Sequence, residues 1–368
     1  PAAPAHAADP ITAAEQPFFS YYHLDQARAK GYTGKGMTIA LLDGEVDTSV
    51  PELAGATVID KTPCTVTSGA SSKSHGTAMA SLLVSKEYGV APDATLLAYR
   101  TNYIKQGDKA ESDCQGHHGN NLDEPEWLIN QAITDGAQII SISATNGQVS
   151  DSLKWAIARA NALGVIVVSG AGNDNEESTI DSYGKWSGVV SVSAIDTSGK
   201  RAEYSSWGKG VTVAAVGGPM VAYDFETGTN INTQGTSNAT PLVAGFLALA
   251  KQKWPNATSN QLLQLLTKTA LNNEGQWNKY TGYGVAAIGP MLNTDPSQYP
   301  DENPIMDKGN DLGPTNEETQ QYLAGLVDPR DVAGDSTYTY RGIDESILKD
   351  TDIPTPIHLG TSPRYHAK

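Results

Sequence analysis

The sequence predicts an α/β protein with three α/β/α layers, in which helices cover both faces of a mostly parallel sheet of roughly seven strands. Three observations predict this fold class. Short runs rich in β-branched residues recur along the chain, segments with helical spacing of apolar residues lie between them, and the runs are apolar on nearly every residue. Strands of that composition are buried on both faces of a sheet, which requires helices on each side.

Seven runs have the length and composition of buried strands. The first of them ends in a carboxylate, and sites in open parallel sheets lie beyond the carboxyl ends of the strands. In chain order the runs are Met37–Asp43, Ala56–Asp60, Ala94–Arg100, Ala137–Ala144, Gly164–Ser169, Val189–Ile195 and Val211–Val216.

Two helix starts have the spacing of a capping box, in which two side chains three residues apart bond each other's backbone N–H groups. Asp123 and Glu126 predict a helix that Gly136 ends, and Thr258 and Gln261 predict another. Both segments carry the apolar face that a helix covering a sheet needs.

Three further helices are predicted from apolar residues at helical spacing. One begins at His75, one runs from Leu153 to Gly164, and one runs from Ser237 to Lys253 before Pro255. The last is apolar around most of its circumference, so we expect it to lie in the centre of the protein.

Length and composition predict one large domain with extensions. The chain has 368 residues, of which 39% are hydrophobic and 18% charged, an ordinary composition for a globular protein. Its 41 acidic and 25 basic residues give a net charge of −16. This charge argues against nucleic acid or anionic membranes as partners. The longest apolar stretch, Leu242–Ala250, is too short to span a bilayer.

The chain divides into three parts by pattern. An N-terminal arm (1–30) and a C-terminal extension (293–368) lack the periodicity of the part between them (31–292). The extension is rich in proline, and from residue 301 it carries 13 Asp and Glu against 6 Lys and Arg, a composition that predicts little core of its own. The first ten residues read like the remains of a removed export signal, so a secreted or extracytoplasmic location is expected.

Four short segments supply, in chain order, the groups needed for attack of a serine on an amide carbonyl. They contain Asp43, His75, Asn173 and Ser237. A carboxylate can orient an imidazole, the imidazole can take the hydroxyl proton, and an amide side chain with a backbone N–H can hold the oxyanion. Each residue also has an ordinary alternative: a loop-capping Asp, a surface His, a turn Asn or a helix N-cap Ser.

Around these residues the chain resembles the subtilase (subtilisin-like) family of serine peptidases. The resemblance extends from Tyr32 to Leu292, and the order Asp, His, Ser is the subtilisin order. It implies a subtilisin-like fold, a catalytic triad of Asp43, His75 and Ser237, and Asn173 as an oxyanion donor. The matching blocks are Asp43, His75-Gly76-Thr77, Gly89-Val90-Ala91-Pro92, Ser205-Ser206-Trp207-Gly208 and Gly235-Thr236-Ser237-x-Ala239-Thr240-Pro241.

The resemblance also implies where a substrate would bind. Ser143, Ala144 and Thr145 would form one edge of a groove that pairs with the substrate backbone, and Gly170 and Gly172 would line the first specificity pocket. The preferred substrate side chain stays open, because the edge differs from the usual family pattern.

The two cysteines are expected to form a disulfide. Cys64 lies between the Asp and His blocks, and Cys114 lies in a long polar segment, residues 101–122, which the bond would fasten beside the site. The alternative is a metal site made by Cys114 with His117 and His118, but adjacent histidines on a polar loop lack the usual ligand spacing. No metal is therefore predicted, and no cofactor is required for catalysis. Structural calcium is open but not predicted.

These observations predict an exported, monomeric serine endopeptidase that hydrolyses protein or peptide substrates through an acyl-enzyme. Its role could be broad degradation or restricted processing, and the long polar segment favours processing. A subtilase-like binding module without significant turnover is the alternative from another class, although no triad residue is missing. An unrelated doubly wound hydrolase would have a Gly-x-Ser-x-Gly elbow, which the chain lacks at Ser237.

Overall fold

The computed structural model describes residues 8–101, 111–116, 121–144, 149–177, 182–272, 275–309, 312–342 and 358–359. Its centre is a seven-stranded sheet in the order β2-β4-β1-β6-β7-β8-β9, and all six pairings are parallel. The predicted α/β fold class is therefore confirmed. The strands are β1 (Thr38–Asp43), β2 (Thr57–Asp60), β4 (Thr95–Arg100), β6 (Ile139–Ile142), β7 (Ile166–Gly170), β8 (Val190–Ile195) and β9 (Val213–Val216).

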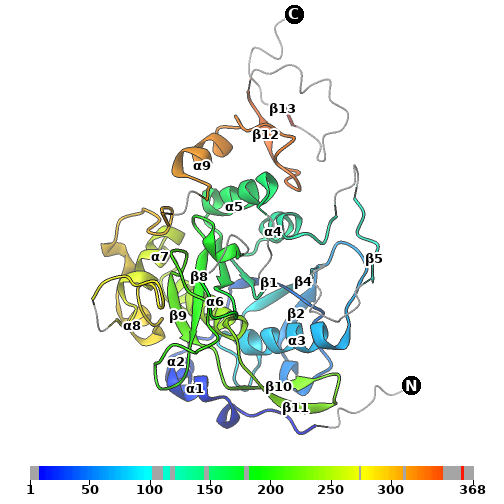
Figure 1. The fold of residues 1–368 in the computed structure, drawn as a ribbon, viewed down its shortest axis with the longest axis vertical. Helices are drawn as coiled ribbons and strands as arrows, with labels where there is room; N and C mark the ends of the chain where they lie inside the picture. The colour runs from blue at the N-terminus through cyan, green and yellow to red at the C-terminus, as the bar shows by residue number, and fades with distance from the viewer. Residues whose placement is uncertain are drawn as a thin grey trace, which may run out of the picture.

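Helices cover both faces of the sheet (Figure 1). On one face lie α3 (Ala70–Val84), α6 (Thr236–Lys253), α7 (Ser259–Lys268) and α8 (Ile288–Asn293), and on the other lie α4 (Pro125–Thr134) and α5 (Asp151–Leu163). Strand β1 explains this division, because its side chains alternate between the two cores. Ile39 and Leu41 join the first core, whereas Ala40 and Leu42 join the second.

Helix α6 runs through the first core, as its all-round apolar composition predicts. Residues Ala239 to Ala250 are all buried. A Cβ atom on Gly245 would lie 2.5 Å from Val90 Cγ1, so this position accepts only glycine without a shift of its neighbour. Pro241 is the sixth residue of the helix and lacks the N–H that would bond the Ser237 carbonyl, which accepts a hydrogen bond from the Ser143 hydroxyl.

The structure corrects the local predictions for strand β2 and for the start of helix α4. Strand β2 is an edge strand, and most of its residues are exposed rather than buried on both faces. Helix α4 starts after Glu124 without a side-chain cap, because Asp123 instead accepts a hydrogen bond of 2.8 Å from Ser112 Oγ. The second predicted capping box, Thr258 with Gln261, is present at the start of α7.

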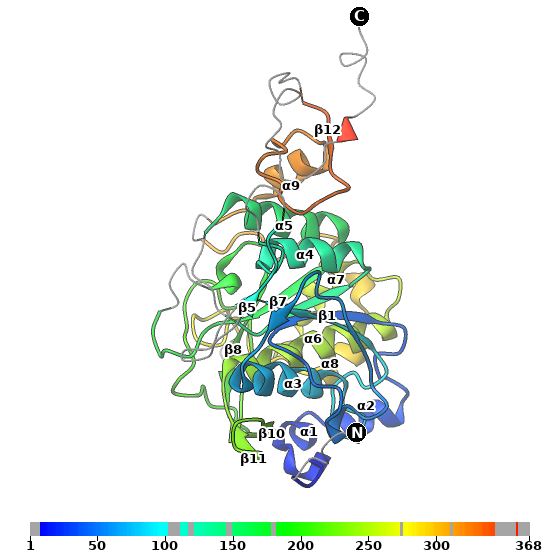
Figure 2. The ribbon, with the colours of Figure 1, turned by 90° about the vertical axis from the view of Figure 1, so that its right-hand side faces the viewer.

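The N-terminal arm packs into the main core. It forms η1 (Ala13–Glu15), α1 (Pro17–Tyr21) and α2 (Leu24–Ala29), beneath the layer that contains α3 (Figure 2). Phe18, Tyr22 and Leu24 are buried in that core. The Tyr22 hydroxyl accepts a hydrogen bond of 2.9 Å from the Val216 N–H, which joins the arm to strand β9.

Residues 312–342 of the C-terminal extension lie on the opposite side, against the outer surface of α5 (Figures 1 and 2), whereas Ile305 belongs to the first core. Its helix α9 (Asn316–Leu323) and the residues that follow form a small cluster with Trp155 and Ala158 of α5. This cluster is a local core that the composition of the extension does not predict. Its members from the extension are Tyr322, Val327, Val332, Tyr338 and Tyr340.

Short elements complete the described parts of the chain. They include two antiparallel pairs, β3 (Val66–Thr67) with β5 (Glu111–Ser112) and β10 (Met220–Asp224) with β11 (Thr229–Thr233), and a parallel pair, β12 (Thr339–Tyr340) with β13 (His358–Leu359). Single turns of 3₁₀ helix are η2 (Pro51–Leu53), η4 (Tyr183–Lys185) and η5 (Pro296–Gln298). Within these described parts, every helix is too short or too polar to cross a bilayer.

Candidate active site

The carboxylate of Asp43 lies at the carboxyl end of β1, in the middle of the sheet, and bonds to an imidazole on α3. Its Oδ1 atom is 2.7 Å from His75 Nδ1 and also accepts a hydrogen bond of 2.7 Å from the Gly44 N–H. Asp43 is buried, whereas the His75 side chain is 28% exposed. A buried carboxylate on Nδ1 favours the tautomer that leaves Nε2 to accept a proton.

Two glycines allow this contact. A Cβ atom on Gly44 would lie 2.1 Å from the Ser72 carbonyl oxygen, and one on Gly76 would lie 2.5 Å from the Gly44 carbonyl oxygen. The loop after β1 therefore touches the backbone of α3. The helix begins at Ala70 and not at His75 as the sequence predicts, so His75 lies in its second turn, where the helix fixes its backbone.

Ser237 is the second residue of α6, after Thr236. The helix N-cap is Gly235, so the alternative interpretation of Ser237 as a helix N-cap serine is wrong. The first N–H groups of a helix have no intrahelical acceptor and lie at the positive end of the helix dipole. The Ser143 hydroxyl, just beyond β6, donates a hydrogen bond of 3.1 Å to the Ser237 carbonyl.

The side chain of Asn173 follows β7 and is oriented by Thr236. Its Oδ1 atom accepts hydrogen bonds from the Thr236 N–H at 2.8 Å and from the Thr236 hydroxyl at 3.1 Å. Because the amide oxygen is held in this way, the Nδ2 donors are left to face away from Thr236. The sequence motifs give no role to Thr236 beyond its place beside Ser237.

One cavity of about 360 Å³ brings most of the predicted site residues together. Gly172 does not line it: its N–H donates to Thr236 Oγ1 at 3.2 Å, and it carries a φ of +109°, a conformation that favours glycine. Thr145 lies outside the described residues. The predicted residues that line the cavity are Asp43, His75, Ser143, Ala144, Gly170, Asn173 and Ser237.

The carboxylate of Glu45, two residues after Asp43, forms ion pairs with Lys73 and Arg100. Glu45 lies 3.6 Å from Lys73 Nζ and 3.3 Å from Arg100 Nη1, and it does not line the cavity. Lys73 also pairs with Asp47 at 2.7 Å. Burial alone would raise the pKa of Asp47, but hydrogen bonds from Lys73 and Ser49 lower it to about 2.

The hairpin β10–β11 forms a wall of the cavity that the sequence analysis missed. Tyr223, Glu226 and Ile231 line the cavity on this side. Two short runs with strand composition, separated by a turn that ends in Gly228, are a sequence signal for a hairpin. That signal could have revealed the hairpin but not its place beside Ser237.

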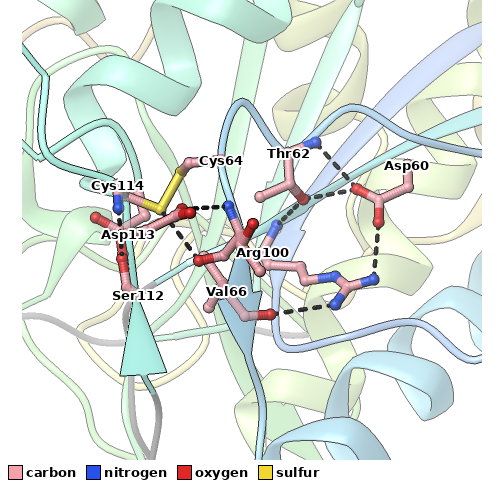
Figure 3. The surroundings of a disulfide bond; sticks show 10 residues. Asp60, Thr62, Cys64, Val66, Arg100, Ser112, Asp113 and Cys114 are labelled. Carbon is pink, nitrogen blue, oxygen red and sulfur yellow. Dashed lines mark hydrogen bonds and ion pairs between the residues drawn. A yellow bond between two sulfur atoms is a disulfide. The ribbon is translucent and has the colours of Figure 1, made fainter.

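The predicted disulfide is present: Cys64 and Cys114 are bonded, with Cα atoms 5.1 Å apart (Figure 3). Hydrogen bonds between the backbone of Thr65 and Asp113 reinforce the same junction, since the Asp113 side chain accepts from the Thr65 N–H at 2.7 Å. Most of the polar segment 101–122 lies outside the described residues.

The alternative metal site loses one ligand, because Cys114 is in the disulfide. His117 and His118 lie outside the described residues. Among the residues that are described, no group of three or more His, Cys, Asp or Glu side chains could hold a metal ion.

The protein has a parallel sheet, and a cavity at the edge of that sheet is lined by Asp, His and Ser. It is therefore an α/β protein with the functional groups of a serine hydrolase. The sequence model of the subtilase family matches residues 34–284, which is most of the chain. The chain therefore belongs to the subtilase family, which are serine peptidases.

Known proteins agree with this membership. The thermostable alkaline protease of Halalkalibacterium halodurans is 32% identical over 259 residues, which is 68% of this chain and 66% of that protein. This match thus spans slightly less than two thirds of the relative's length. The structure of the prenylagaramide maturation protease PagA is 25% identical, with a TM-score of 0.60 over 73% of this chain and 96% of that one. MycP1 from Mycobacterium smegmatis shares the fold, with 22% identity and a TM-score of 0.63 over 84% of this chain and 89% of that one.

Proposed function

We propose that the protein is a serine endopeptidase with Asp43, His75 and Ser237 as its catalytic triad. The observation that supports this most is the 2.7 Å contact between Asp43 Oδ1 and His75 Nδ1 in a cavity that Ser237 also lines. Membership of the subtilase family and the similarity to a thermostable alkaline protease support the same chemistry.

In the proposed reaction, His75 Nε2 removes the proton of the Ser237 hydroxyl as the oxygen attacks the carbonyl carbon of a peptide bond. The oxyanion that forms accepts hydrogen bonds from Asn173 Nδ2 and from the Ser237 N–H at the start of α6. His75 then gives the proton to the leaving amine, the C–N bond breaks, and an acyl-enzyme forms. Water, deprotonated by His75, releases the acyl group and restores Ser237.

The substrate groove belongs to this proposal. Ser143 and Ala144, beyond the end of β6, would pair with the substrate backbone, with Thr145 as the predicted next residue of that edge. Gly170 lines the cavity and lies close to α6, where a Cβ atom would be 2.9 Å from Thr236 Oγ1, and the Gly172 N–H bonds that same hydroxyl in the loop that carries Asn173. The substrate is a protein or peptide.

The proposed domain division follows the sequence boundaries, with a catalytic domain of residues 31–292, an N-terminal arm before it and a C-terminal extension after it. An exported, monomeric enzyme is proposed as well. The Cys64–Cys114 bond suits an oxidising compartment, since disulfides are rare where thiols are kept reduced.

Within this activity, we favour restricted processing over broad degradation. The disulfide ties Cys114, which belongs to the long polar segment, to Cys64, which follows β2 at the carboxyl edge of the sheet, the edge from which Asp43 faces the cavity. PagA, which is similar in structure, is a maturation protease. Digestion of a mixed peptide library tests this role, because dispersed cleavage of unrelated sequences would contradict it.

Active-site labelling tests the activity itself. A fluorophosphonate should label the native protein at Ser237, and Ser237→Ala should lose both the label and the turnover of a casein substrate. Heat-unfolded protein is the control, because only a folded site activates the hydroxyl. A folded native protein that takes no label would instead favour the binding module without turnover.

A further inference from the structure

The cavity that holds Ser237 continues past His75 to a surface that the catalytic motifs do not include. We call this surface the hairpin wall, and define it by Ser71 and Ser74 of α3 and by Tyr223, Glu226 and Ile231 of the β10–β11 hairpin. Figures 1 and 2 both place this hairpin beside α3. The five residues come from segments about 150 positions apart, as the Ser74–Asp224 separation shows.

The proposed reaction says which part of a substrate would meet this wall. His75 must reach the nitrogen of the leaving amine to protonate it. The part of the cavity beyond His75 therefore faces the residues that follow the scissile bond. Asn173 and Ser143, which belong to the oxyanion and acyl sides, approach Ser237 from β7 and β6 instead.

The hairpin is fixed next to His75 by a buried carboxylate. Asp224 Oδ1 lies 3.1 Å from Ser74 Oγ, and Asp224 Oδ2 accepts a hydrogen bond of 2.8 Å from Thr227 Oγ1. The Phe225 N–H donates to Ser74 Oγ at 2.8 Å. Burial alone would raise the pKa of Asp224, but hydrogen bonds from Thr227, the Glu226 N–H and Ser74 lower it overall. The wall is thus anchored at the residue that precedes the catalytic histidine.

Glu226 is the carboxylate that this anchoring leaves available. It is exposed on the turn of the hairpin and lines the cavity. Among the described residues, no cation forms an ion pair with it. Lys73, on the adjacent helix, is held at 2.7 Å from Asp47 and lies over the Phe225 ring at 4.6 Å.

Apolar surface adjoins this carboxylate. Ile231 is 39% exposed although it is a large hydrophobic residue, and it lines the same cavity as Tyr223. A Lys or Arg side chain combines an apolar stem with a charged end, and it binds best to a surface that offers apolar contact and then a carboxylate. The net charge of −16 also favours approach of cationic peptides.

We propose that the hairpin wall selects substrates with a Lys or Arg side chain on the C-terminal side of the scissile bond, and that Glu226 pairs with its charge. This inference rests on the proposed peptidase function and gives it a substrate class. Glu226 is a specificity residue here, and Ser74 and Asp224 are positioning residues.

Library digestion, followed by mass spectrometry of the cleavage sites, tests the inference. We expect Lys and Arg to be enriched about 3- to 10-fold in the two positions after the cleaved bond, with less enrichment in high salt, since exposed ion pairs are modest and screened. Glu226→Gln should remove the enrichment, and Glu226→Lys should reverse it in favour of Glu and Asp. Glu317→Gln, the same change at an exposed position on α9, is the matched control and should change nothing.

The fluorophosphonate label separates failure of the two proposals. If the wild-type protein is labelled and cleaves peptides but shows no basic enrichment, or if Glu226→Gln keeps the enrichment, the specificity of the hairpin wall is wrong and the peptidase assignment stands. If neither label nor cleavage occurs, the peptidase assignment is wrong, and the inference falls with it. Equal labelling rates in Glu226→Gln and wild type would show that the variant still folds an intact site.

Discussion

Two buried aspartates of this protein make the same kind of bond with different consequences. Asp43 is 5% exposed and lies 2.7 Å from His75 in the cavity, whereas Asp335 is 1% exposed and lies 3.3 Å from Arg159 under the C-terminal extension. His75 opens onto the cavity. Arg159 is 3% exposed, and its Nη1 and Nη2 groups donate hydrogen bonds to Asn130, Thr134 and Thr337.

The two aspartates differ in the side chain that each one bonds, an imidazole for Asp43 and a guanidinium for Asp335. An imidazole changes its charge near neutral pH and can exchange a proton with whatever enters the cavity, but a guanidinium stays charged and exchanges none. The first pair is therefore suited to chemistry and the second to holding one segment against another. Asp335 also accepts hydrogen bonds from Tyr322 and Thr337, so its contacts join α9 to the tail that follows it.

Asp43→Asn is the change with the largest expected effect. It should lower kcat by about 10⁴-fold, because an amide cannot stabilise the imidazolium or hold the required tautomer. Stability should change little, since the Asn oxygen can still accept from the Gly44 N–H. Steady-state kinetics and thermal unfolding together measure both, and a kcat within tenfold of wild type would remove Asp43 from the triad.

Asp335→Ala should lower stability and leave the activity of the folded protein unchanged. We expect a loss of about 3–5 kcal/mol in the free energy of unfolding, because the change leaves the buried Arg159 without its carboxylate. Labelling of Ser237 should persist wherever the catalytic domain stays folded. Denaturant titration measures the loss, and Asp331→Ala, an exposed neighbour, is the control, expected to change stability by at most about 0.5 kcal/mol. Equal losses for the two variants would contradict a structural role for the Arg159–Asp335 pair.

Asn173→Ala tests the proposed oxyanion donor beside the Asp43–His75 pair. Removal of one oxyanion donor should lower kcat by about 10²–10³-fold, with KM changed much less. Thr236→Val should give a smaller loss, because the Thr236 N–H still holds Asn173 Oδ1 after the hydroxyl is removed. The oxyanion role would be withdrawn if kcat for Asn173→Ala stayed within twofold of wild type.

Lys154→Met is expected to have the smallest effect. Lys154, like Arg159, joins α5 to the C-terminal extension: it pairs with Glu318 at 3.1 Å and with Asp151 of its own helix at 3.3 Å, but these side chains are partly or largely exposed. Exposed pairs contribute about 0–1 kcal/mol and are screened by salt. A loss in denaturant titration as large as that of Asp335→Ala would show that burial does not decide which pair holds the extension.

Much of the fold could be predicted because its signals are local. The sequence predicts all seven strands of the central sheet, since buried parallel strands are apolar on nearly every residue. The edge position of β2 could not be predicted, because the composition of this strand resembles that of the central strands. Only the strand order in the sheet leaves Ile59 exposed. The Asp123 capping box failed for a similar reason: Ser112, a distant residue, bonds that carboxylate instead.

The sequence by itself determined the subtilase motifs, the α/β class and the cysteine pair, because each depends on residue identity, spacing or period along the chain. Only the tertiary structure decided that the hairpin β10–β11 forms a wall of the cavity, that Thr236 orients Asn173, and that Asp335 lies on Arg159. These contacts join positions far apart in the chain, and their residues are common polar types whose partners depend on the fold. Composition predicted little core for the extension, yet it packs its tyrosines and valines on Trp155, because a small apolar set becomes a core when a helix supplies the opposing face.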